Sequence, residues 1–375
     1  MKLLILTQKI DKNDDVLGFF HDWVIEFAKH CEKVTVIALS VGEYDLPRNV
    51  KVLSLGKELS SQMSESLPAG RQVHKVESKK KYLFNFYRYI WSEKNNYDNV
   101  FVHMNPEYVI LGGLFWRIMG KKIGLWYMHK SVDFKLRVAE KLTHTIFSGT
   151  RESFRLKTKK LNITGHGIPS QKFIKSKSLP AGRQVRKANE EFKMITVGRI
   201  SPIKDYETLI NAIKILKIKN QNVNLDIIGE IGLPDQDDYL SKLKQKIKDE
   251  SLEENINFMG SVSHKDIVNH LNQADLFVNM SQTGSLDKVI LEAMACEIIT
   301  ISSNDSSRNV FEEYKDKLFF KSKDSEDLAK KVSKIIELSD GDRVKIEKRL
   351  REIVRRDHNL EDLIKKVISI YQKIQ

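Results

Sequence analysis

The stretch FKMITVGRISPIKDYETLINAIKIL, residues 192–216, contains the pattern that decides the fold. Its first part, FKMITVG, is a short apolar run that predicts a buried β-strand ending at Gly198. From 207 onward, apolar residues recur three and four positions apart, which predicts a helix beginning between Asp205 and Glu207. A strand that leads directly into a helix is typical of parallel α/β sheets.

The same alternation recurs along the whole chain. The strands predicted in the first half are MKLLILT, KVTVIAL, VKVLSL, NVFVHM and KIGLWYM, and those in the second half are FKMITVG, LDIIGE, NINFMG, DLFVNM and EIITISS. Helical spacing lies between them, for example at 207–218 and 264–274. Strands that are apolar nearly throughout indicate parallel sheets covered on both faces. Two such series predict two doubly wound, Rossmann-like domains.

The length of the chain agrees with two domains, because 375 residues exceed what one core usually holds. We expect an N-terminal domain over 1–170 and a second over 190–357. The join falls in a stretch at 166–192 that is rich in Ser, Lys and Gly. Residues 358–375 contain an amphipathic helix whose apolar face we expect to join the core.

The composition is that of a globular protein, with 41% hydrophobic and 30% charged residues. Two cysteines, Cys31 and Cys296, match no metal spacing, which favours a reducing, cytoplasmic compartment. The initial apolar run is too short for a signal peptide. The apolar run at 108–120 contains Arg117 and is shorter than the roughly 18–20 residues of a membrane span, so no transmembrane helix is expected.

The formal net charge of +13 favours anionic partners such as a phosphorylated substrate, a membrane face or nucleic acid. Nucleic acid is not expected, because the basic residues are dispersed and no nucleic-acid-binding signature occurs. The segment 74–91 mixes lysines with aromatic residues. This leaves peripheral contact with the inner face of a membrane open, against the alternative of a solvated charged face.

The octapeptide SLPAGRQV occurs twice, at 66–73 and at 178–185. Two copies without a regular period do not make a repeat architecture. Both copies lie between predicted elements, where insertions are tolerated, so we interpret them as exposed loops. A duplicated binding arm is the alternative.

Two cations follow the strand that ends at Gly198. Ligands of open α/β sheets bind beyond the carboxyl ends of the strands, so Arg199 and Lys204 are expected in the ligand crevice. A planar guanidinium and a mobile ammonium suit a diphosphate. The alternative is two solvated loop cations in a lysine-rich protein.

The stretch TGSLDKVILEAMAC, residues 283–296, combines a small polar loop with an apolar helix. A helix N-terminus exposes unpaired N–H groups, and Gly284 and Ser285 allow an anion to approach them closely. Glu292 lies about one turn inside the predicted helix, where its carboxylate can accept hydrogen bonds from a ribose. The alternative is an i,i+4 ion pair between Lys288 and Glu292.

These two segments, about 80 residues apart, resemble the retaining, nucleotide-sugar-dependent glycosyltransferases of family 4. VGRISPIKDYETLINAI is similar to that family's VGRL-x-x-x-K-G-x-x-x-L-I-x-A segment. IIGE (227–230), INFMGSVSHKDIVNHLNQADLFVNMS (256–281) and LEAMAC follow in the family's order. The resemblance covers the C-terminal half strongly and the N-terminal half weakly. It implies the GT-B fold, in which two Rossmann-like domains face a central cleft and a C-terminal helix crosses back to the N-terminal domain.

The resemblance also implies roles for residues. Arg199 and Lys204, after Gly198, match the pair that grips the donor diphosphate, and Glu292 matches the second glutamate of the family's E-x7-E motif. The first glutamate of that motif falls at Gly284. Its substitutes are Asp287 or the backbone amides of Gly284 and Ser285. The donor-binding residues expected on this basis are Gly198, Arg199, Lys204, Gly284, Ser285, Asp287, Lys288 and Glu292.

The N-terminal half contributes three weaker candidates. His103, at the end of the predicted strand NVFVH, matches a histidine that the family places beside the donor sugar. Without the resemblance, a structural histidine is the better interpretation. His129 ends another predicted strand, and Gly18 is similar to a glycine of the family's first loop, so both are candidates for the acceptor side.

The implied reaction transfers a hexose-type sugar from a nucleoside-diphosphate sugar to an acceptor hydroxyl, with retention, in polysaccharide or glycolipid biosynthesis. His103, Arg199 and Lys204 are the expected catalytic residues, and neither a metal nor a further cofactor is expected. The acceptor is unknown, and a lipid-linked acceptor remains open. Two alternatives are a non-catalytic sugar-nucleotide-binding protein and a nucleotide-sugar epimerase. A dinucleotide oxidoreductase is not expected, because no G-x-G-x-x-G follows the first strand.

Overall fold

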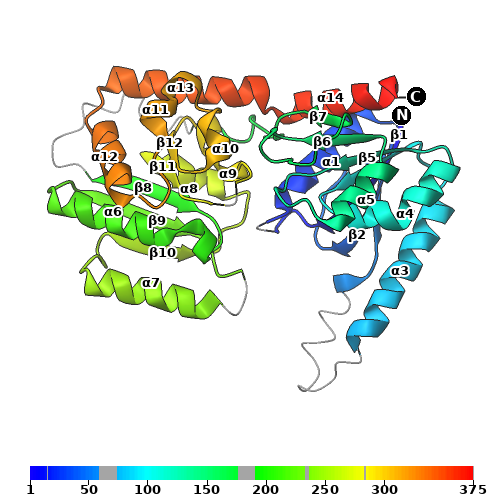
Figure 1. Cartoon of the computed structure of the whole chain (residues 1–375), viewed down its shortest axis with the longest axis horizontal. Helices are drawn as coiled ribbons and strands as arrows, with labels where there is room; N and C mark the ends of the chain where they lie inside the picture. The colour runs from blue at the N-terminus through cyan, green and yellow to red at the C-terminus, as the bar shows by residue number, and fades with distance from the viewer. Residues whose placement is uncertain (15, 59–73, 176–190, 233–235, 283, 375) are drawn as a thin grey trace. The chain divides into compact units, whose positions relative to one another are not determined.

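A computed structural model describes residues 1–14, 16–58, 74–175, 191–232, 236–282 and 284–374, the side chains of 74–78 excepted (Figure 1). Both copies of SLPAGRQV and Thr283 lie outside the described residues. Packing divides the chain into two units. Unit 1 comprises Met1–Gly167 and Leu360–Gln375, and unit 2 comprises Ile168–Asn359.

Unit 1 is built on a parallel sheet of seven strands in the order β3-β2-β1-β4-β5-β6-β7. The strands are β1 (Lys2–Ile10), β2 (Lys33–Val41), β3 (Val50–Ser54), β4 (Asn99–His103), β5 (Lys122–Trp126), β6 (Thr145–Ser148) and β7 (Leu161–Ile163). The sequence predicted the first five of these strands. It missed β6 and β7, which have four and three residues and are too short to show a period.

Both faces of this sheet are covered. The helices of unit 1 are α1 (Gly18–His30), α3 (His74–Ser92), α4 (Pro106–Ile118), α5 (Phe134–Leu142) and α14 (Leu360–Lys373). Leu3 and Ile5 of β1 pack in one core with α1 and α14, whereas Leu4 and Leu6 pack in a second core with α3, α4 and α5. Successive side chains of a strand point to opposite faces, so a continuously apolar strand supplies both cores.

The C-terminal helix α14 packs against α1 within unit 1 (Figure 1). Tyr371, fully buried, donates a hydrogen bond from its hydroxyl to the carbonyl of Val100 over 2.7 Å. A Cβ atom at position 124 would overlap the Tyr371 hydroxyl. Gly124 therefore lets the tyrosine lie directly on the sheet.

Unit 2 is built on a parallel sheet of five strands in the order β10-β9-β8-β11-β12. The strands are β8 (Phe192–Val197), β9 (Val223–Ile228), β10 (Ile256–Gly260), β11 (Leu276–Asn279) and β12 (Ile299–Ser302). All five were predicted from the sequence. The parallel pairing of both sheets confirms the predicted fold class of two Rossmann-like α/β domains.

Helices cover the second sheet and share one continuous hydrophobic core with it. They are α6 (Tyr206–Ile218), α7 (Asp237–Asp249), α8 (Ile267–Gln273), α9 (Lys288–Ala295), α10 (Asp305–Arg308), α11 (Lys315–Leu318), α12 (Ser325–Ile336) and α13 (Asp340–Asp357), with 3₁₀ turns η1 (Pro202–Lys204) and η3 (Glu312–Tyr314). In the described part of either unit, no helix is both long and apolar enough to cross a bilayer.

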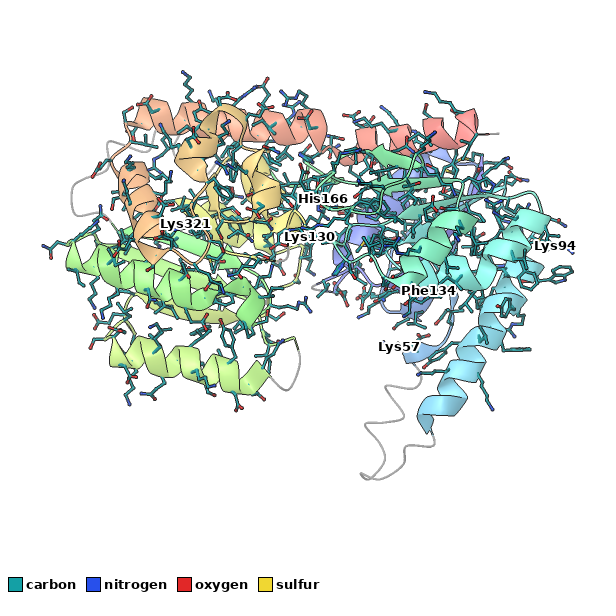
Figure 2. The ribbon with its side chains drawn as sticks, in the orientation of Figure 1. Lys57, Lys94, Lys130, Phe134, His166 and Lys321 are labelled. Atoms are coloured by element: carbon teal, nitrogen blue, oxygen red, sulfur yellow. The ribbon has the colours of Figure 1, made fainter. Side chains whose placement is uncertain are left out.

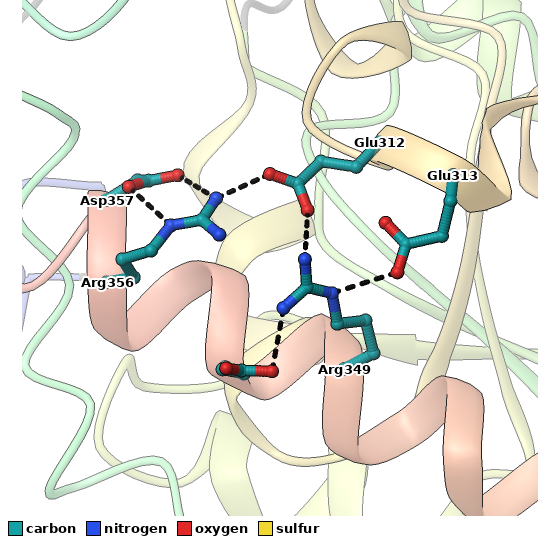
Figure 3. Close-up of polar contacts among 6 residues, drawn as sticks. Glu312, Glu313, Arg349, Arg356 and Asp357 are labelled. Atoms are coloured by element: carbon teal, nitrogen blue, oxygen red, sulfur yellow. Dashed lines mark hydrogen bonds and ion pairs between the residues drawn. The ribbon is translucent and has the colours of Figure 1, made fainter.

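A network of ion pairs joins η3 to α13 on the surface of unit 2 (Figure 3). Arg349 donates to Glu312 and Glu313 over 2.8 and 3.0 Å, and Arg356 donates to Glu312 over 2.5 Å. Exposed pairs of this kind contribute little each, but the shared carboxylate fixes where the turn meets the helix.

Candidate functional site

The predicted site residues of unit 2 lie where the strand order of its sheet reverses. The chain passes from β8 to β9 and β10 on one side, and then returns to β11 on the other side of β8. The loops after β8 and β11 diverge at such a reversal and leave a crevice, which is the usual ligand site of open α/β sheets. Lys204 follows β8, and Asp287 follows β11.

Lys204 links these two loops through its ammonium group. Its Nζ donates to Oδ2 of Asp287 over 2.5 Å and to Oγ of Ser281 over 3.3 Å. Both side chains of the Lys204–Asp287 pair are 15% exposed. The ammonium carries three donors, and these two are the bonds it makes among the described residues.

Asp287 is ionised in this arrangement. Burial by itself raises the pKa of its carboxyl, but the charge of Lys204 and hydrogen bonds from Lys204, Asn279 and Ser281 hold the pKa below its ordinary value. Asn279 donates from Nδ2 to Oδ2 of Asp287 over 3.0 Å. The sequence did not single out Asn279 and Ser281. The signal that could have found them is polar residues at the carboxyl end of a buried strand.

Asp205 makes the turn between η1 and α6 with a left-handed backbone (φ 52°). The resembling motif carries a glycine at this position, and aspartate is among the few other residues that enter this region readily. Its Oδ2 accepts from Thr208 over 2.9 Å and from Gln282 over 3.2 Å. Burial raises the pKa of this carboxyl. Asp205 thus ties the loop after β8 to the loop after β11 a second time.

Arg199 takes a different direction from Lys204. Its side chain is exposed, and a Cβ atom on Gly232, in the loop after β9, would lie 3.0 Å from its Cδ. Lys204 instead passes over Gly198, 3.4 Å from where a Cβ would stand, toward the loop after β11. The structure therefore brings Lys204 together with Asp287, and it places Arg199 on the β9 side of β8.

Gly284 and Ser285 form a tightly held loop before α9. Gly284 has φ 70°, a conformation that costs a residue with a side chain about 1–2 kcal/mol. Its carbonyl accepts from Oγ of Ser306 over 2.5 Å, and the carbonyl of Ser285 accepts from Nδ2 of Asn304 over 2.7 Å. The loop after β12 thus fixes this backbone, and the conformation disfavours a glutamate at 284.

Glu292 lies in the second turn of α9 and is 4% exposed. Its Oε1 contacts Nε2 of His264 at 2.9 Å and Nζ of Lys288 at 3.7 Å. The i,i+4 pair that the sequence offered as the alternative is therefore present. His264, which precedes α8, was not foreseen. Two basic groups around one buried carboxylate keep its orientation fixed.

In unit 1, His103 ends β4 beside β1, where the order of the first sheet reverses. It is 2% exposed, its Nδ1 lies 3.3 Å from Oγ1 of Thr7, and its ring stacks on Phe20 at 4.0 Å between centroids. Thr7 and Phe20 thus fix the imidazole at the same topological position that Lys204 and Asp287 occupy in unit 2.

The other two candidates of unit 1, Gly18 and His129, have surroundings that differ from those of His103. Gly18 is the first residue of α1, and its N–H donates to the carbonyl of Asp14. Asp14 also accepts from the backbone N–H groups of Val16 and Leu17, in the turn that precedes the helix. His129 is exposed and accepts at Nδ1 from the N–H of Ser131 over 3.1 Å.

The fold, with two Rossmann-like α/β domains in one chain, is that of the GT-B class. Residues 181–356 match the model of the family described as glycosyl transferases group 1. A solved structure of Anabaena HepE in complex with UDP and glucose has a TM-score of 0.72 and 17% identity, with 99% of each chain covered. The chain therefore shares the fold of the HepE structure, and its C-terminal part is similar to glycosyl transferases group 1.

Two curated relatives are similar to the C-terminal part. Mannosylfructose-phosphate synthase of Agrobacterium fabrum is 26% identical over 155 residues, covering 40% of this chain and 34% of that protein. The amylovoran biosynthesis glycosyltransferase AmsK of Erwinia amylovora is 28% identical over 154 residues, covering 39% and 34%. The chain thus spans about a third of the length of these relatives.

Proposed function

We propose that this chain is a retaining glycosyltransferase that moves a hexose from a nucleoside-diphosphate sugar to an acceptor hydroxyl. The observation that carries the proposal is the cluster at the carboxyl ends of β8 and β11, where Lys204, Asp287 and the start of α9 meet inside the group 1 match. The name of AmsK supports a polysaccharide product, with a glycolipid as the related possibility. The ligands of the HepE structure support UDP as the nucleotide.

The leaving group of this reaction is a diphosphate, so negative charge grows on its oxygens as the glycosidic bond breaks. Lys204 meets this charge with its ammonium group, which lies between the loops after β8 and β11. The N–H groups at the start of α9 add the partial positive charge of a helix N-terminus. Fixed donors of this kind stabilise a transition state because they need no reorganisation when the charge appears.

Asp287 has a positioning role in this scheme. It binds Lys204 and Asn279, and so holds the ammonium between the two loops. Glu292 is proposed to accept hydrogen bonds from the ribose. Arg199 reaches the diphosphate only if its exposed side chain turns from Gly232 toward the β11 side of β8. We propose that His103 contacts the sugar, and that the departing phosphate takes the acceptor's proton.

Gly284 supports a second candidate, a sugar-nucleotide-binding protein without turnover. The resembling motif has a glutamate near the transferred sugar at this position, and the left-handed backbone of Gly284 disfavours one. Its function would end at donor binding.

The first test is calorimetric binding of UDP, GDP and ADP and of their hexose derivatives to the full chain. A nucleotide at 100 times its Kd adds about 2.7 kcal/mol of stability, which a thermal shift also detects. The E292Q variant keeps the shape of the side chain and is expected to weaken binding about 10–100-fold, because a hydrogen bond to a charged acceptor is replaced. The matched control is E347Q, which neutralises the buried carboxylate of Glu347 on α13; this carboxylate pairs with Lys175.

Equal binding by wild type and E292Q would contradict the assignment of Glu292. Binding of no nucleotide at all would contradict the proposal as a whole. Product analysis by NMR then separates the alternatives: an α- or β-glycoside with the donor's configuration supports transfer, donor binding without product supports the second candidate, and an epimerised donor without acceptor supports an epimerase.

A further inference from the structure

Exposed apolar side chains of unit 1 gather on two neighbouring helices. On α3, Phe84 is 67% and Trp91 59% exposed, and on α4, Leu114 is 62% and Ile118 77% exposed. Phe84, Arg88 and Trp91 follow one another at helical spacing, so they lie on one face of α3. Together with Leu114, Phe115 and Ile118 they form what we call the α3–α4 surface.

This surface has a fixed shape. The hydroxyl of Tyr87 donates to the carbonyl of Leu111 over 3.1 Å, and the ring of Tyr87 lies 5.3 Å from that of Phe115. The two helices therefore stay together and enclose a groove of about 400 Å³, lined by Phe84, Tyr87, Arg88, Ile90, Trp91, Phe115 and Met119. An exposed apolar groove of this kind marks an interaction site.

The charges around the groove are positive. Lys79, Lys80 and Lys81 are exposed and lie one turn before Phe84. The guanidinium of Arg88 lies 4.9 Å from the ring of Tyr89. Lys94, which follows α3 and is labelled in Figure 2, has its Nζ 3.9 Å from the ring of Trp91. Residues 79–92 contain no aspartate or glutamate; Glu77 precedes them in the sequence, and Glu93, which follows, is buried and paired with Lys51.

We propose that the α3–α4 surface docks on an anionic lipid bilayer without crossing it. Aromatic side chains beside lysine and arginine suit the boundary between headgroups and acyl chains, because the rings enter it while the cations reach the lipid phosphates. A run of lysines with no acidic residue fits a continuous anionic surface. A second copy of this positive face would repel it, and a protein partner would need matching acidic residues. The proposal is independent of the sugar-transfer reaction.

The test is sedimentation of the full chain with vesicles of phosphatidylcholine alone, or of phosphatidylcholine mixed with phosphatidylglycerol, with no donor or acceptor present. We expect binding to the mixed vesicles only, and less of it at high salt. Trp91 provides a second readout, because Trp23, Trp116 and Trp126 are at most 2% exposed. Its emission should shift to shorter wavelength on binding, and the W91F variant should abolish that shift.

Variants of exposed residues separate the contribution of charge to vesicle binding from that of the apolar side chains. Each basic residue near an anionic surface changes partitioning about fivefold, so K79Q/K80Q/K81Q is expected to bind about a hundredfold more weakly. F84S/W91S is expected to lose about tenfold. The control K242Q/K248Q/K345Q removes the same charge from exposed positions of α7 and α13 and should bind as the wild type does.

The proposal fails if the mixed vesicles do not sediment the protein, or if the control triple variant weakens binding as much as K79Q/K80Q/K81Q. It also fails if F84S/W91S abolishes a concentration-dependent dimer seen by analytical ultracentrifugation while vesicle binding is absent, since a second copy would then be the occupant. Thermal unfolding of each variant confirms that the change in binding is not a loss of fold.

Discussion

Removing the ammonium of Lys204 should destabilise unit 2, and the loss should depend on pH. The K204M variant keeps most of the apolar stem but leaves the Asp287 carboxylate without its counter-ion. Breaking a fully buried pair costs about 3–5 kcal/mol. Here both side chains retain 15% exposure and Asn279 still donates to Asp287, so we expect about 2–3 kcal/mol. For a unit of this size that lowers Tm by about 5–10 °C.

The pH dependence follows from the pKa of Asp287. In the wild type Lys204 holds that pKa below its unfolded value, so the pair's contribution is fully present above about pH 4 and is lost only as the pH falls further. In K204M the pKa of Asp287 is higher than in the wild type, because burial still raises it and only the hydrogen bonds from Asn279 and Ser281 remain to lower it. Protonation then relieves the buried charge, so the deficit is largest at neutral pH and shrinks as the pH falls.

The assay is scanning calorimetry of the full chain across this pH range for K204M, D287N and K204M/D287N. The double variant removes both charges and should recover to within about 1 kcal/mol of the wild type, giving a coupling energy of about 2 kcal/mol. The control K345M makes the same change at an exposed lysine of α13 and should have no effect. A K204M deficit that is absent, or that persists unchanged in the double variant at every pH, would refute the buried pair.

Two further predictions concern the cores of the units. In unit 1, G124A should lower the free energy of unfolding by about 2–3 kcal/mol, because its methyl group overlaps the Tyr371 hydroxyl. Adding Y371F to this variant should restore part of the lost stability. Equal Tm values for G124A and G124A/Y371F would contradict the contact. Burial raises the pKa of the Cys31 thiol to about 11 and that of Cys296 to about 12. At pH 8 neither thiol should therefore react with a disulfide reagent until the chain unfolds. Rapid labelling of the native protein would contradict the burial of these thiols.

Much of the fold could be predicted from the sequence, because strand and helix periods are local properties. Five strands of each sheet and the start of α6 were found in this way, whereas β6 and β7 are too short to show a period. Part of the candidate site was equally local: the positions of Lys204 after a strand, Gly284 before a helix and Glu292 inside it could be read from the sequence, whereas their proposed roles rest on the family resemblance.

Which of these residues meet was decided by the tertiary structure. The contacts of Lys204 with Ser281 and Asp287 span 77 and 83 residues, and that of Thr7 with His103 spans 96. Strand patterns do not state which strands are neighbours, so the pairing of β8 with β11 and of β1 with β4 cannot be read from them. That pairing depends on which side of the first strand each crossover returns to, and the fit of the helices against both faces of the sheet decides it. Arg199 and Lys204 are five residues apart in the sequence, yet Arg199 lies on the β9 side of β8 and Lys204 on the β11 side.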